Sequence, residues 1–565
     1  MTITRRSLLL ALAVSLAGLT LLAAPAPAPV AARHGMVVAQ EARAARIGAD
    51  VLRNGGNAVD AAVATGFALA VSYPRAGNIG GGGYMLIHLA ARNVDAAIDY
   101  RETAPAAITR DAFLDEKGGA DPAKSRDSAL AIGVPGTVAG LALAHARYGS
   151  GKFTLAELIA PAIRLARDGF PVEDDVADSL PRAQARLARW PASAKVFLKA
   201  EGGVLGPGDA LVQRDLAETL TQIARAGPRA FYEGEIAEKI AAAVRAAGGV
   251  MTRDDLKSYA AIERAPVTGS YRGHRIVSMP PSSSGGVALI EMLNILEGYK
   301  LGEIDAAGRL HLMVEAMKRA YFDRARFLGD PASVTPPPYL TLKRFAASVR
   351  SKIAPDRAAP AESFGPLLAP PREGDNTTHF SVVDRFGNAV ANTTTLNFSY
   401  GVGLVAEGTG VLLNNELDDF AAKPGAPNAF GLVGGEANAP GPGKRPLSSM
   451  TPTIVLKDGR PLLVTGSPGG SRIITAVLQV VVNVVDRKLA LADAVAEPRL
   501  HHQWLPDEVV LERGFAPDLM RALAARGHHV AIDGPRTSAN SIAVTPDGPV
   551  GAADPRTRGA LAAGE

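Results

Sequence analysis

The sequence predicts a layered α/β globule in which sheets of mostly antiparallel strands are covered by helices. Blocks of strand-like and helix-like pattern alternate along the chain. Several strand-like pairs are joined by tight turns such as Asp458-Gly459, which is typical of antiparallel hairpins. The hydrophobic content of 47% and charged content of 21% are those of a folded protein rather than a disordered one. The 565 residues are long enough for several domains or one large one.

The N-terminal residues have the layout of a secretory signal peptide. Arg5 and Arg6 precede an uncharged stretch, 7–24, and Ala-x-Ala patterns follow it. We expect residues 1–28 to be removed on export, which predicts a periplasmic or secreted protein. The two arginines also weakly resemble a twin-arginine signal. An uncleaved membrane anchor is the alternative, because about 18 apolar residues can just span a bilayer. No later segment is apolar for long enough, so the mature chain is expected to have no membrane partner.

The first half of the chain is expected to be mostly helical. Residues 58–71 are almost all apolar, which predicts a buried helix. The glycine-rich run 77–83 is interpreted as a tight turn where backbones pack closely. The expected elements are helices at 39–52 and 58–71, strands at 84–88 and 95–100, and Ala-rich helices broken by turns over 108–265.

The second half is richer in strands. A Pro-rich, weakly patterned stretch, 329–376, is expected to be an exposed loop. At Thr377 the pattern changes to alternation, which predicts a hairpin. The expected elements are a strand at 271–279, helices at 285–299, 306–328, 471–485 and 516–526, and hairpins pairing 378–384 with 388–396, 453–457 with 461–465, and 541–545 with 550–553.

Several classes of function are excluded or disfavoured by composition and missing motifs. The absence of cysteine removes disulfides, thiolate metal sites and a cysteine nucleophile. The net charge of +4 comes without a Lys/Arg block, so no nucleic-acid partner is expected. The histidines form no metal-binding motif, and no dinucleotide or P-loop fingerprint is present, so neither a metal nor a cofactor is expected. The motifs of common serine hydrolases are also absent.

One candidate nucleophile remains, at the point where the strand-rich part begins. A hydroxyl needs a nearby base, and a threonine made N-terminal by chain cleavage can use its own α-amine. Thr377 begins a predicted strand and follows the exposed loop, as such a residue should. From these residues alone, an ordinary threonine-rich start of a strand remains the alternative.

The segment NTTHFS at 376–381 resembles the γ-glutamyltransferase (glutathione hydrolase proenzyme) family of N-terminal-nucleophile hydrolases. The resemblance extends from about residue 35 to the C-terminus. Further matching motifs occur in family order: RETAP at 101–105, GVPG at 133–136, PSSSGG at 281–286, LNNELDDF at 413–420, KRPLSSM at 444–450 and GSPGGSR at 466–472.

This resemblance implies a four-layer αββα sandwich and a self-processing enzyme. The chain would cut itself between Asn376 and Thr377, giving a large subunit, 29–376, and a small subunit, 377–565, that stay associated. Thr377 would then attack the γ-glutamyl amide of glutathione and related small molecules. Water, an amino acid or a peptide would accept the glutamyl group from the resulting ester.

The resemblance also implies a set of substrate-binding residues. A γ-glutamyl group ends in an α-carboxylate and an α-ammonium, and Arg101 is suited to fork onto the carboxylate. Taken without the family, Arg101 could form a surface ion pair with Glu102, the serines a turn or helix cap, and the acidic residues a solvated turn. The implied partners are Arg101, Ser448 and Ser449 for the carboxylate, and Asn397, Glu416 and Asp419 for the ammonium.

The remaining implied residues act on the reacting atoms. Gly469 and Gly470 match the family's oxyanion hole, although a plain Pro-Gly-Gly turn is the alternative. Thr395 matches the residue whose hydroxyl supports the nucleophile, although it could be only one more strand-forming threonine. His379 is expected to be structural.

Two positions depart from common family patterns. The segment 424–430 resembles a lid over the glutamyl pocket, with Phe430 where many bacterial members have tyrosine. Glu416 stands where some members have glutamine. Two other functions are alternatives: a related acylase acting on β-lactam side chains, and an exported binding protein without activity.

Overall fold

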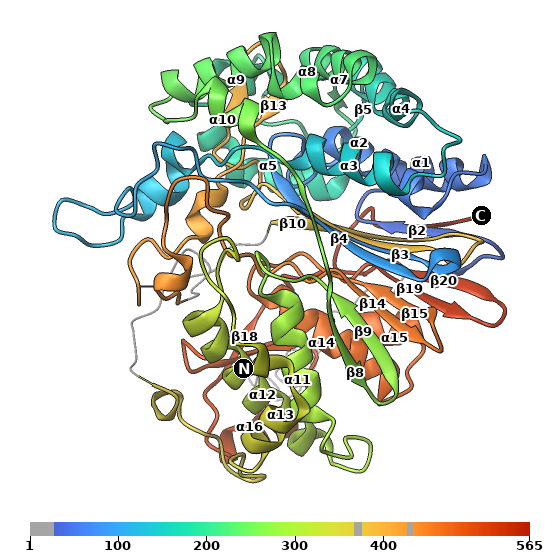
Figure 1. The fold of residues 1–565 in the computed structure, drawn as a ribbon, viewed down its shortest axis with the longest axis vertical. Helices are drawn as coiled ribbons and strands as arrows, with labels where there is room; N and C mark the ends of the chain where they lie inside the picture. The colour runs from blue at the N-terminus through green and yellow to red at the C-terminus, as the bar shows by residue number, and fades with distance from the viewer. Residues whose placement is uncertain (1–27, 366–375, 427–432) are drawn as a thin grey trace, which may run out of the picture.

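The computed structural model describes residues 28–365, 376–426 and 433–565. Two seven-stranded sheets pack face to face, and helices cover both outer faces, so the molecule is an αββα sandwich of four layers (Figure 1). All neighbouring strands in these two sheets are antiparallel. The predicted fold class is therefore confirmed.

The first sheet has the strand order β21-β2-β10-β11-β3-β4-β7 and lies beneath the N-terminal helices. Its strands are β21 (Leu561–Gly564), β2 (Met36–Ala39), β10 (Thr377–Val383), β11 (Ala389–Thr395), β3 (Gly82–Leu89), β4 (Val94–Tyr100) and β7 (Ile262–Arg264). The helices of this half are α1 (Ala42–Arg53), α2 (Ala58–Ser72), α3 (Thr137–Tyr148), α4 (Leu155–Asp168), α5 (Asp174–Leu187), α6 (Pro191–Phe197), α7 (Arg214–Ala226), α8 (Arg229–Tyr232), α9 (Glu235–Ala246) and α10 (Arg253–Ser258).

The second sheet has the order β1-β20-β19-β15-β14-β9-β8. Its strands are β1 (Val30–Ala31), β20 (Gly548–Ala552), β19 (Ser541–Thr545), β15 (Arg460–Thr465), β14 (Thr453–Lys457), β9 (His274–Ser278) and β8 (Val267–Tyr271). The helices on its side are α11 (Gly285–Leu296), α12 (Ala306–Phe327), α13 (Lys343–Arg350), α14 (Arg472–Val485), α15 (Leu491–Ala496) and α16 (Pro517–Ala525). Smaller sheets pair β5 (Phe170–Pro171) with β6 (Ala210–Leu211), β12 (Val405–Ala406) with β13 (Val411–Leu412), and β16 (Leu500–His501), β17 (Val509–Glu512) and β18 (Val530–Asp533).

Three hydrophobic cores separate the four layers. In β3, Met85 packs toward the helices while its neighbours Tyr84 and Leu86 pack toward the other sheet. Successive side chains of a strand point to opposite faces, so a strand covered on both sides has no polar face. This is why β3 is buried along its whole length. On the far side, Val455 and Leu463 of the second sheet pack against the core beneath α11, α12 and α14.

The glycine run lies where backbones meet closely, as predicted. A Cβ on Gly81 would lie 2.2 Å from the Thr395 carbonyl oxygen, and one on Gly83 would lie 2.3 Å from that of Thr393. Only glycine allows β3 and the preceding loop to approach β11 this closely. The run therefore fixes the end of β11, where Thr395 lies.

Some predicted elements differ from the structure. The helix expected at 39–52 starts later, because Met36–Ala39 pairs with β10 and β21 as a strand. The single strand expected at 271–279 is part of the hairpin β8–β9, with both Arg272 and Gly273 at positive φ. The loop expected at 329–376 contains the helix α13. None of the described helices combines the length and apolar character needed to cross a membrane. The signal-peptide prediction concerns residues 1–28, nearly all outside the described ranges.

Candidate active site

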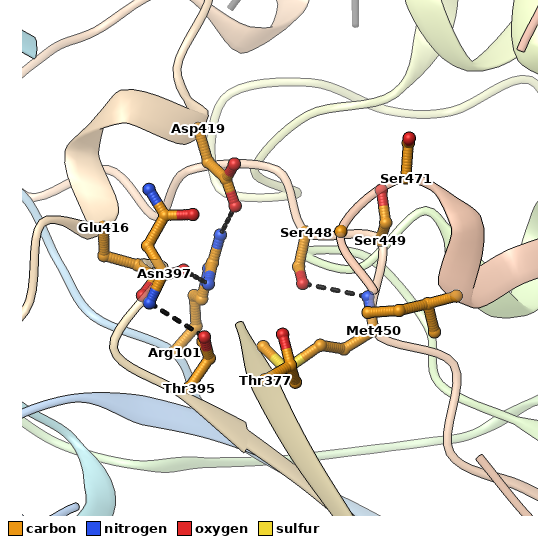
Figure 2. A pocket seen from close by; sticks show the side chains of 12 residues that line it. Arg101, Thr377, Thr395, Asn397, Glu416, Asp419, Ser448, Ser449, Met450 and Ser471 are labelled. Atoms are coloured by element: carbon orange, nitrogen blue, oxygen red, sulfur yellow. Dashed lines mark hydrogen bonds and ion pairs between the residues drawn. The ribbon is translucent and has the colours of Figure 1, made fainter. Parts of the chain in front are cut away.

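A small pocket opens where the ends of β4, β10 and β11 meet the loops before β14 and α14. Figure 2 shows Arg101 lying between Glu416 and Asp419, with Thr377 and Ser448 across the pocket. The sequence-predicted residues on its wall are Arg101, Thr377, Thr395, Asn397, Glu416, Asp419, Ser448, Ser449 and Gly470. Met450, Ser471 and Ile473, which the sequence did not single out, complete the lining. Residues spread over the whole chain are thus brought to one place.

Thr377 and Thr395 are directly opposite each other in the β10–β11 pair. The Thr395 hydroxyl donates to the carbonyl oxygen of Asn376 at 2.8 Å and accepts from the Asn397 amide at 2.8 Å. A donor on a carbonyl oxygen stabilises the negative charge that develops when the carbonyl carbon is attacked. Thr395 is therefore positioned to polarise the peptide bond that precedes Thr377.

The Asn376 side chain is held on the other side of this bond. Its amide oxygen accepts from Arg75 Nη2 at 2.9 Å and from the Ser399 hydroxyl. Arg75 is itself fixed by Asp175, at 2.8 Å, and Asp175 also accepts from the Tyr73 hydroxyl. Both the carbonyl and the side chain of Asn376 therefore have fixed partners.

Arg101 is completely buried directly after β4. Its two terminal nitrogens donate to Glu416 and Asp419, and its Nε donates to the Pro446 carbonyl at 3.0 Å. Glu102 lies farther away, with its nearest carboxyl oxygen 3.9 Å from Arg101 Nη1. Both side chains are completely buried, so this contact is not the surface ion pair that was the alternative interpretation of Arg101.

Three carboxyl groups share this one guanidinium. Burial, and secondarily the Asp419 charge, raises the pKa of Glu416 to about 7 against the pull of Arg101. Burial and then the charge of Glu416 raise the pKa of Glu102 well above its usual range. Apart from the contact between the two carboxyl groups, neither oxygen of Glu102 has a hydrogen-bond partner among the described residues, nor does Glu416 Oε2. The cluster therefore carries more acid than Arg101 can neutralise, and it suits an added cation.

The 3-10 turn η6 (Glu416–Asp419) is positioned by the buried Asn414. The Asn414 amide nitrogen donates to the carbonyls of Gly80 and Gly133, both at 2.8 Å. Its oxygen accepts from the amides of Gly133 and Glu416. Motifs that are far apart in the sequence therefore meet at this one asparagine. The solvated acidic turn that was the alternative for these residues is not what the structure has, since Glu416 and Asp418 are buried.

Ser448 and Ser449 lie on a segment clamped by the start of α11. The Ser448 carbonyl accepts from the amide and hydroxyl of Ser284, at 2.8 and 2.7 Å. The Ser448 hydroxyl accepts from the Met450 amide at 3.0 Å, which closes a local turn and leaves its proton to donate. The Ser449 hydroxyl accepts from Arg324 at 3.3 Å. Ser448 therefore forms the local turn that was the alternative interpretation, and it also lies on the wall of the pocket, as expected for a binding residue.

Gly469 and Gly470 precede α14, at φ of +126° and +55°. Gly470 lines the pocket, whereas Gly469 is not among the lining residues. A Cβ on Gly469 would lie 2.7 Å from the carbonyl oxygen of Arg536, so this turn requires glycine. The amino end of α14 also presents its positive dipole to this side of the pocket.

His379 is buried within the two-sheet core, where it contacts Thr393 at 2.9 Å and Ser381 at 3.1 Å. Burial lowers its pKa to about 3, so it stays neutral. In the described part of the chain, His311, Glu315 and His528 have the arrangement of possible metal ligands. The two imidazoles bond each other at 2.8 Å and Glu315 lies 3.5 Å from Lys318, so protein contacts account for this cluster.

Sequence reasoning missed several residues beside the pocket. Arg324 is buried near the end of α12 and donates to Ser284 at 2.9 Å as well as to Ser449. Arg75 and Ser399 hold Asn376. The only sequence signal for these two residues was position: Arg75 lies just before the glycine run, and Ser399 lies two residues after Asn397. The candidate lid 424–430, including Phe430, lies largely outside the described residues.

The fold defines the class: this αββα sandwich is that of N-terminal-nucleophile hydrolases. It matches the crystal structure of a cephalosporin acylase from Bacillus halodurans with a TM-score of 0.84 and 28% identity, over 96% of this chain and 98% of that one. It also matches the γ-glutamyltranspeptidase of Helicobacter pylori, with a TM-score of 0.55 and 44% identity, over 56% of this chain and 91% of that one.

The sequence comparisons define the family. Residues 44–564 match the family described as Gamma-glutamyltranspeptidase. The chain is 51% identical over 540 residues to the glutathione hydrolase proenzyme of Escherichia coli strain K12. The aligned residues cover 95% of this chain and 93% of the relative. The chain therefore belongs to the gamma-glutamyltranspeptidase family and is an enzyme, as its motifs predicted.

Proposed function

We propose that this enzyme is a self-processing γ-glutamyl hydrolase and transferase that cleaves the γ-glutamyl amide bond of glutathione and related compounds. The observation that carries the proposal is the pocket itself, where a threonine at the start of a strand faces a buried arginine and an excess of carboxyl groups. An α-amino acid end carries a carboxylate and an ammonium, which this set complements.

Self-cleavage is proposed between Asn376 and Thr377. The Thr377 hydroxyl attacks the Asn376 carbonyl, whose oxygen is already bonded by Thr395. The C–N bond then breaks, which frees the α-amine of Thr377 and leaves Asn376 joined to Thr377 Oγ as an ester. Water hydrolyses this ester, which leaves a carboxylate on Asn376 and restores the Thr377 hydroxyl. This gives a large subunit of 29–376 and a small subunit of 377–565. N-terminal sequencing of active protein that finds no chain starting at Thr377 would contradict this step.

In the mature enzyme the freed amine of Thr377 takes the hydroxyl proton, and the oxygen attacks the γ-amide carbon. Arg101, Ser448 and Ser449 bind the glutamyl carboxylate, and Asn397, Glu416 and Asp419 accept from its ammonium. Backbone amides of Gly469 and Gly470 stabilise the negative oxygen at the attacked carbon. The amine portion leaves with a proton, and water or an amino acid or peptide then releases the glutamyl group.

The acylase in the same fold is the second candidate, because the cephalosporin acylase matches over nearly the whole chain. A glutaryl group has the same length as a glutamyl group but lacks the ammonium, so Glu416 and Asp419 would have Arg101 as their cationic partner and no ammonium to offset the remaining charge. We therefore expect a γ-glutamyl anilide to be hydrolysed at least about tenfold faster than a glutaryl anilide, since an unmatched buried charge costs about 1–3 kcal/mol. A preference for the glutaryl compound would favour the acylase.

Export is proposed from the N-terminal sequence, with the enzyme in the periplasm or outside the cell. Cell fractionation and the mass of the mature large fragment test this. Activity confined to the cytoplasmic fraction, with residues 1–28 retained, would contradict it.

A further inference from the structure

A second cleft adjoins the glutamyl pocket at the Asn376–Thr377 bond. Thr377 lines the pocket, and Asn376 lines the cleft. The cleft holds about 430 Å³, which is within the range of small-molecule sites. Its wall is one face of α5 together with Arg75, Asn376, Phe398, Ser399 and Arg536. We name it the Asn376 cleft.

The Asn376 cleft is rich in guanidinium groups. Arg182 and Arg186 lie one turn apart on α5, and Arg75 and Arg536 face them from other segments. Its two acidic residues are already paired: Asp175 with Arg75 at 2.8 Å, and Asp178 with Arg558. Arg536 is also paired, with Asp533 at 2.8 Å. The positive charge that remains, on Arg182 and Arg186, favours an anionic ligand.

Two of these arginines lack a full set of partners. Arg186 donates to the Ser399 carbonyl, but its Nε is buried with no hydrogen-bond partner in the described part of the chain. Burial lowers the pKa of Arg186, and the neighbouring charges of Arg189 and Arg126 act in the same direction against that of Asp127. Arg182 is exposed and makes no ion pair with another described residue. A carboxylate in the cleft would give the exposed Arg182 guanidinium an acceptor and place a negative charge beside Arg186.

The cleft also already binds an oxygen acceptor. Arg75 and Ser399 donate to the amide oxygen of Asn376. A carboxylate oxygen accepts the same two hydrogen bonds, and more strongly because it is charged. Once the chain is cut and Asn376 is no longer tied to Thr377, these donors are free to take another acceptor.

The distances suit a dipeptide. Two extended residues span at most about 7 Å, which is as far as the terminal carboxylate of a leaving dipeptide can lie from the carbon it leaves. The Asn376 side chain and its 2.9 Å hydrogen bond to Arg75 together connect the Asn376 carbonyl to the Arg75 guanidinium. This separation is of the same order as the length of a dipeptide.

We propose that the Asn376 cleft binds the C-terminal carboxylate of the peptide portion of a γ-glutamyl peptide, and likewise the carboxylate of a peptide acceptor. This inference rests on the proposed function and assigns the half of the substrate that the glutamyl pocket does not bind. The recognised chemistry is a short peptide with a free C-terminal carboxylate.

The donor test uses the fully processed enzyme, with the double variant Arg182→Gln/Arg186→Gln and the control Arg189→Gln, which removes one positive charge outside the cleft. Arg189 is exposed just beyond α5 and does not line the cleft. Glutathione carries the dipeptide carboxylate, whereas γ-glutamyl-p-nitroanilide carries none. We expect the double variant to lower kcat/KM for glutathione by about tenfold or more and to change that for the anilide by less than about twofold. An equal loss with both donors, or no loss with either, overturns the proposal.

The acceptor test needs only the wild-type enzyme, so it holds even where the double variant fails to fold. With the anilide as donor, glycylglycine is expected to have a KM about tenfold below that of glycylglycinamide at a pH where both amines are equally protonated. Equal KM values overturn the acceptor part. Turnover of the anilide tests the proposed function by itself. An enzyme without γ-glutamyl activity would contradict both the proposed function and this inference. An active enzyme without a carboxylate preference would contradict this inference alone.

Discussion

At the scale of single residues, Thr377 carries two roles in the proposed mechanism. Thr377→Ala removes the hydroxyl that attacks both the Asn376 carbonyl and the substrate. We expect a single uncut chain on a denaturing gel and no measurable turnover. The fold should be retained, because the substitution removes few atoms from β10, which is buried along its whole length. Thr378→Ala is a matched control in the same strand and should still be cut. A cut and active Thr377→Ala enzyme would show that another group is the nucleophile.

Arg101 should matter for substrate binding and little for self-cleavage, because the cleavage step involves no free glutamyl group. Arg101→Lys keeps a charge beside Glu416 and Asp419 but loses the planar fork. We expect KM for a γ-glutamyl anilide to rise by about 10- to 100-fold, as the loss of a charged hydrogen bond of about 1.5–3 kcal/mol implies. Processing is followed on a gel in the same preparation. Equal damage to processing would assign Arg101 a structural role.

Glu416 should make donor binding depend on pH. Because its pKa is raised to about 7, Glu416 holds a proton below that pH and accepts the substrate ammonium as an anion only above it. KM for the donor should therefore fall as pH rises through about 7, and Glu416→Gln should flatten this change. The effect on stability has the opposite sign. Because the folded state keeps the Glu416 proton longer than the unfolded state does, the free energy of unfolding falls as pH rises from the ordinary pKa of a glutamate to about 7. A KM profile identical in both enzymes would contradict this role.

The sequence predicted candidate catalytic and substrate-binding residues from their motifs, and the structure brings all of them except Gly469 to the wall of one pocket. The sequence could not identify Arg75 or Arg324 as neighbours of the pocket, because their roles arise from tertiary contacts alone. Arg324 reaches Ser449 across more than a hundred residues of chain. No local pattern in an amphipathic helix distinguishes such an arginine from one on a solvated face.

At the scale of elements, hairpins with clear turn residues were predicted well, such as β14–β15 around Asp458-Gly459. The β8–β9 hairpin was missed because its turn uses Arg272 in the left-handed region, which a sequence pattern rarely signals. The strand β2 was missed because its residues are apolar and lead directly into a helix. Its pairing with β10 and β21, both distant in sequence, decides its conformation.

The glycine run gives a prediction at this same scale. Gly81→Ala places a methyl group 2.2 Å from the Thr395 carbonyl oxygen, which must move the end of β11. We expect slower self-cleavage and a loss of about 1–3 kcal/mol in unfolding free energy, measured by denaturant titration. Gly302→Ala, where no atom lies within 4 Å, is the control. Normal processing in Gly81→Ala would mean that Thr395 does not depend on this packing.

At the scale of the whole molecule, the proposed cut lies where it cannot easily separate the two fragments. In the first sheet, β10 and β11 after the proposed cut pair with β2 and β3 before it. In the second sheet, β14 after the cut pairs with β9 before it, and β20 pairs with β1. Both sheets are therefore made of strands from both fragments, and the core between them is shared as well.

This interleaving predicts that the fragments remain one particle after cleavage. We expect the processed enzyme to elute at the volume of the uncut Thr377→Ala chain in size-exclusion chromatography, and to separate only in denaturant. The two fragments should also unfold in one transition, because neither retains a complete sheet when the other is removed. Separate unfolding transitions, or elution of a free small fragment without denaturant, would contradict this, since each would require a fragment with its own complete core.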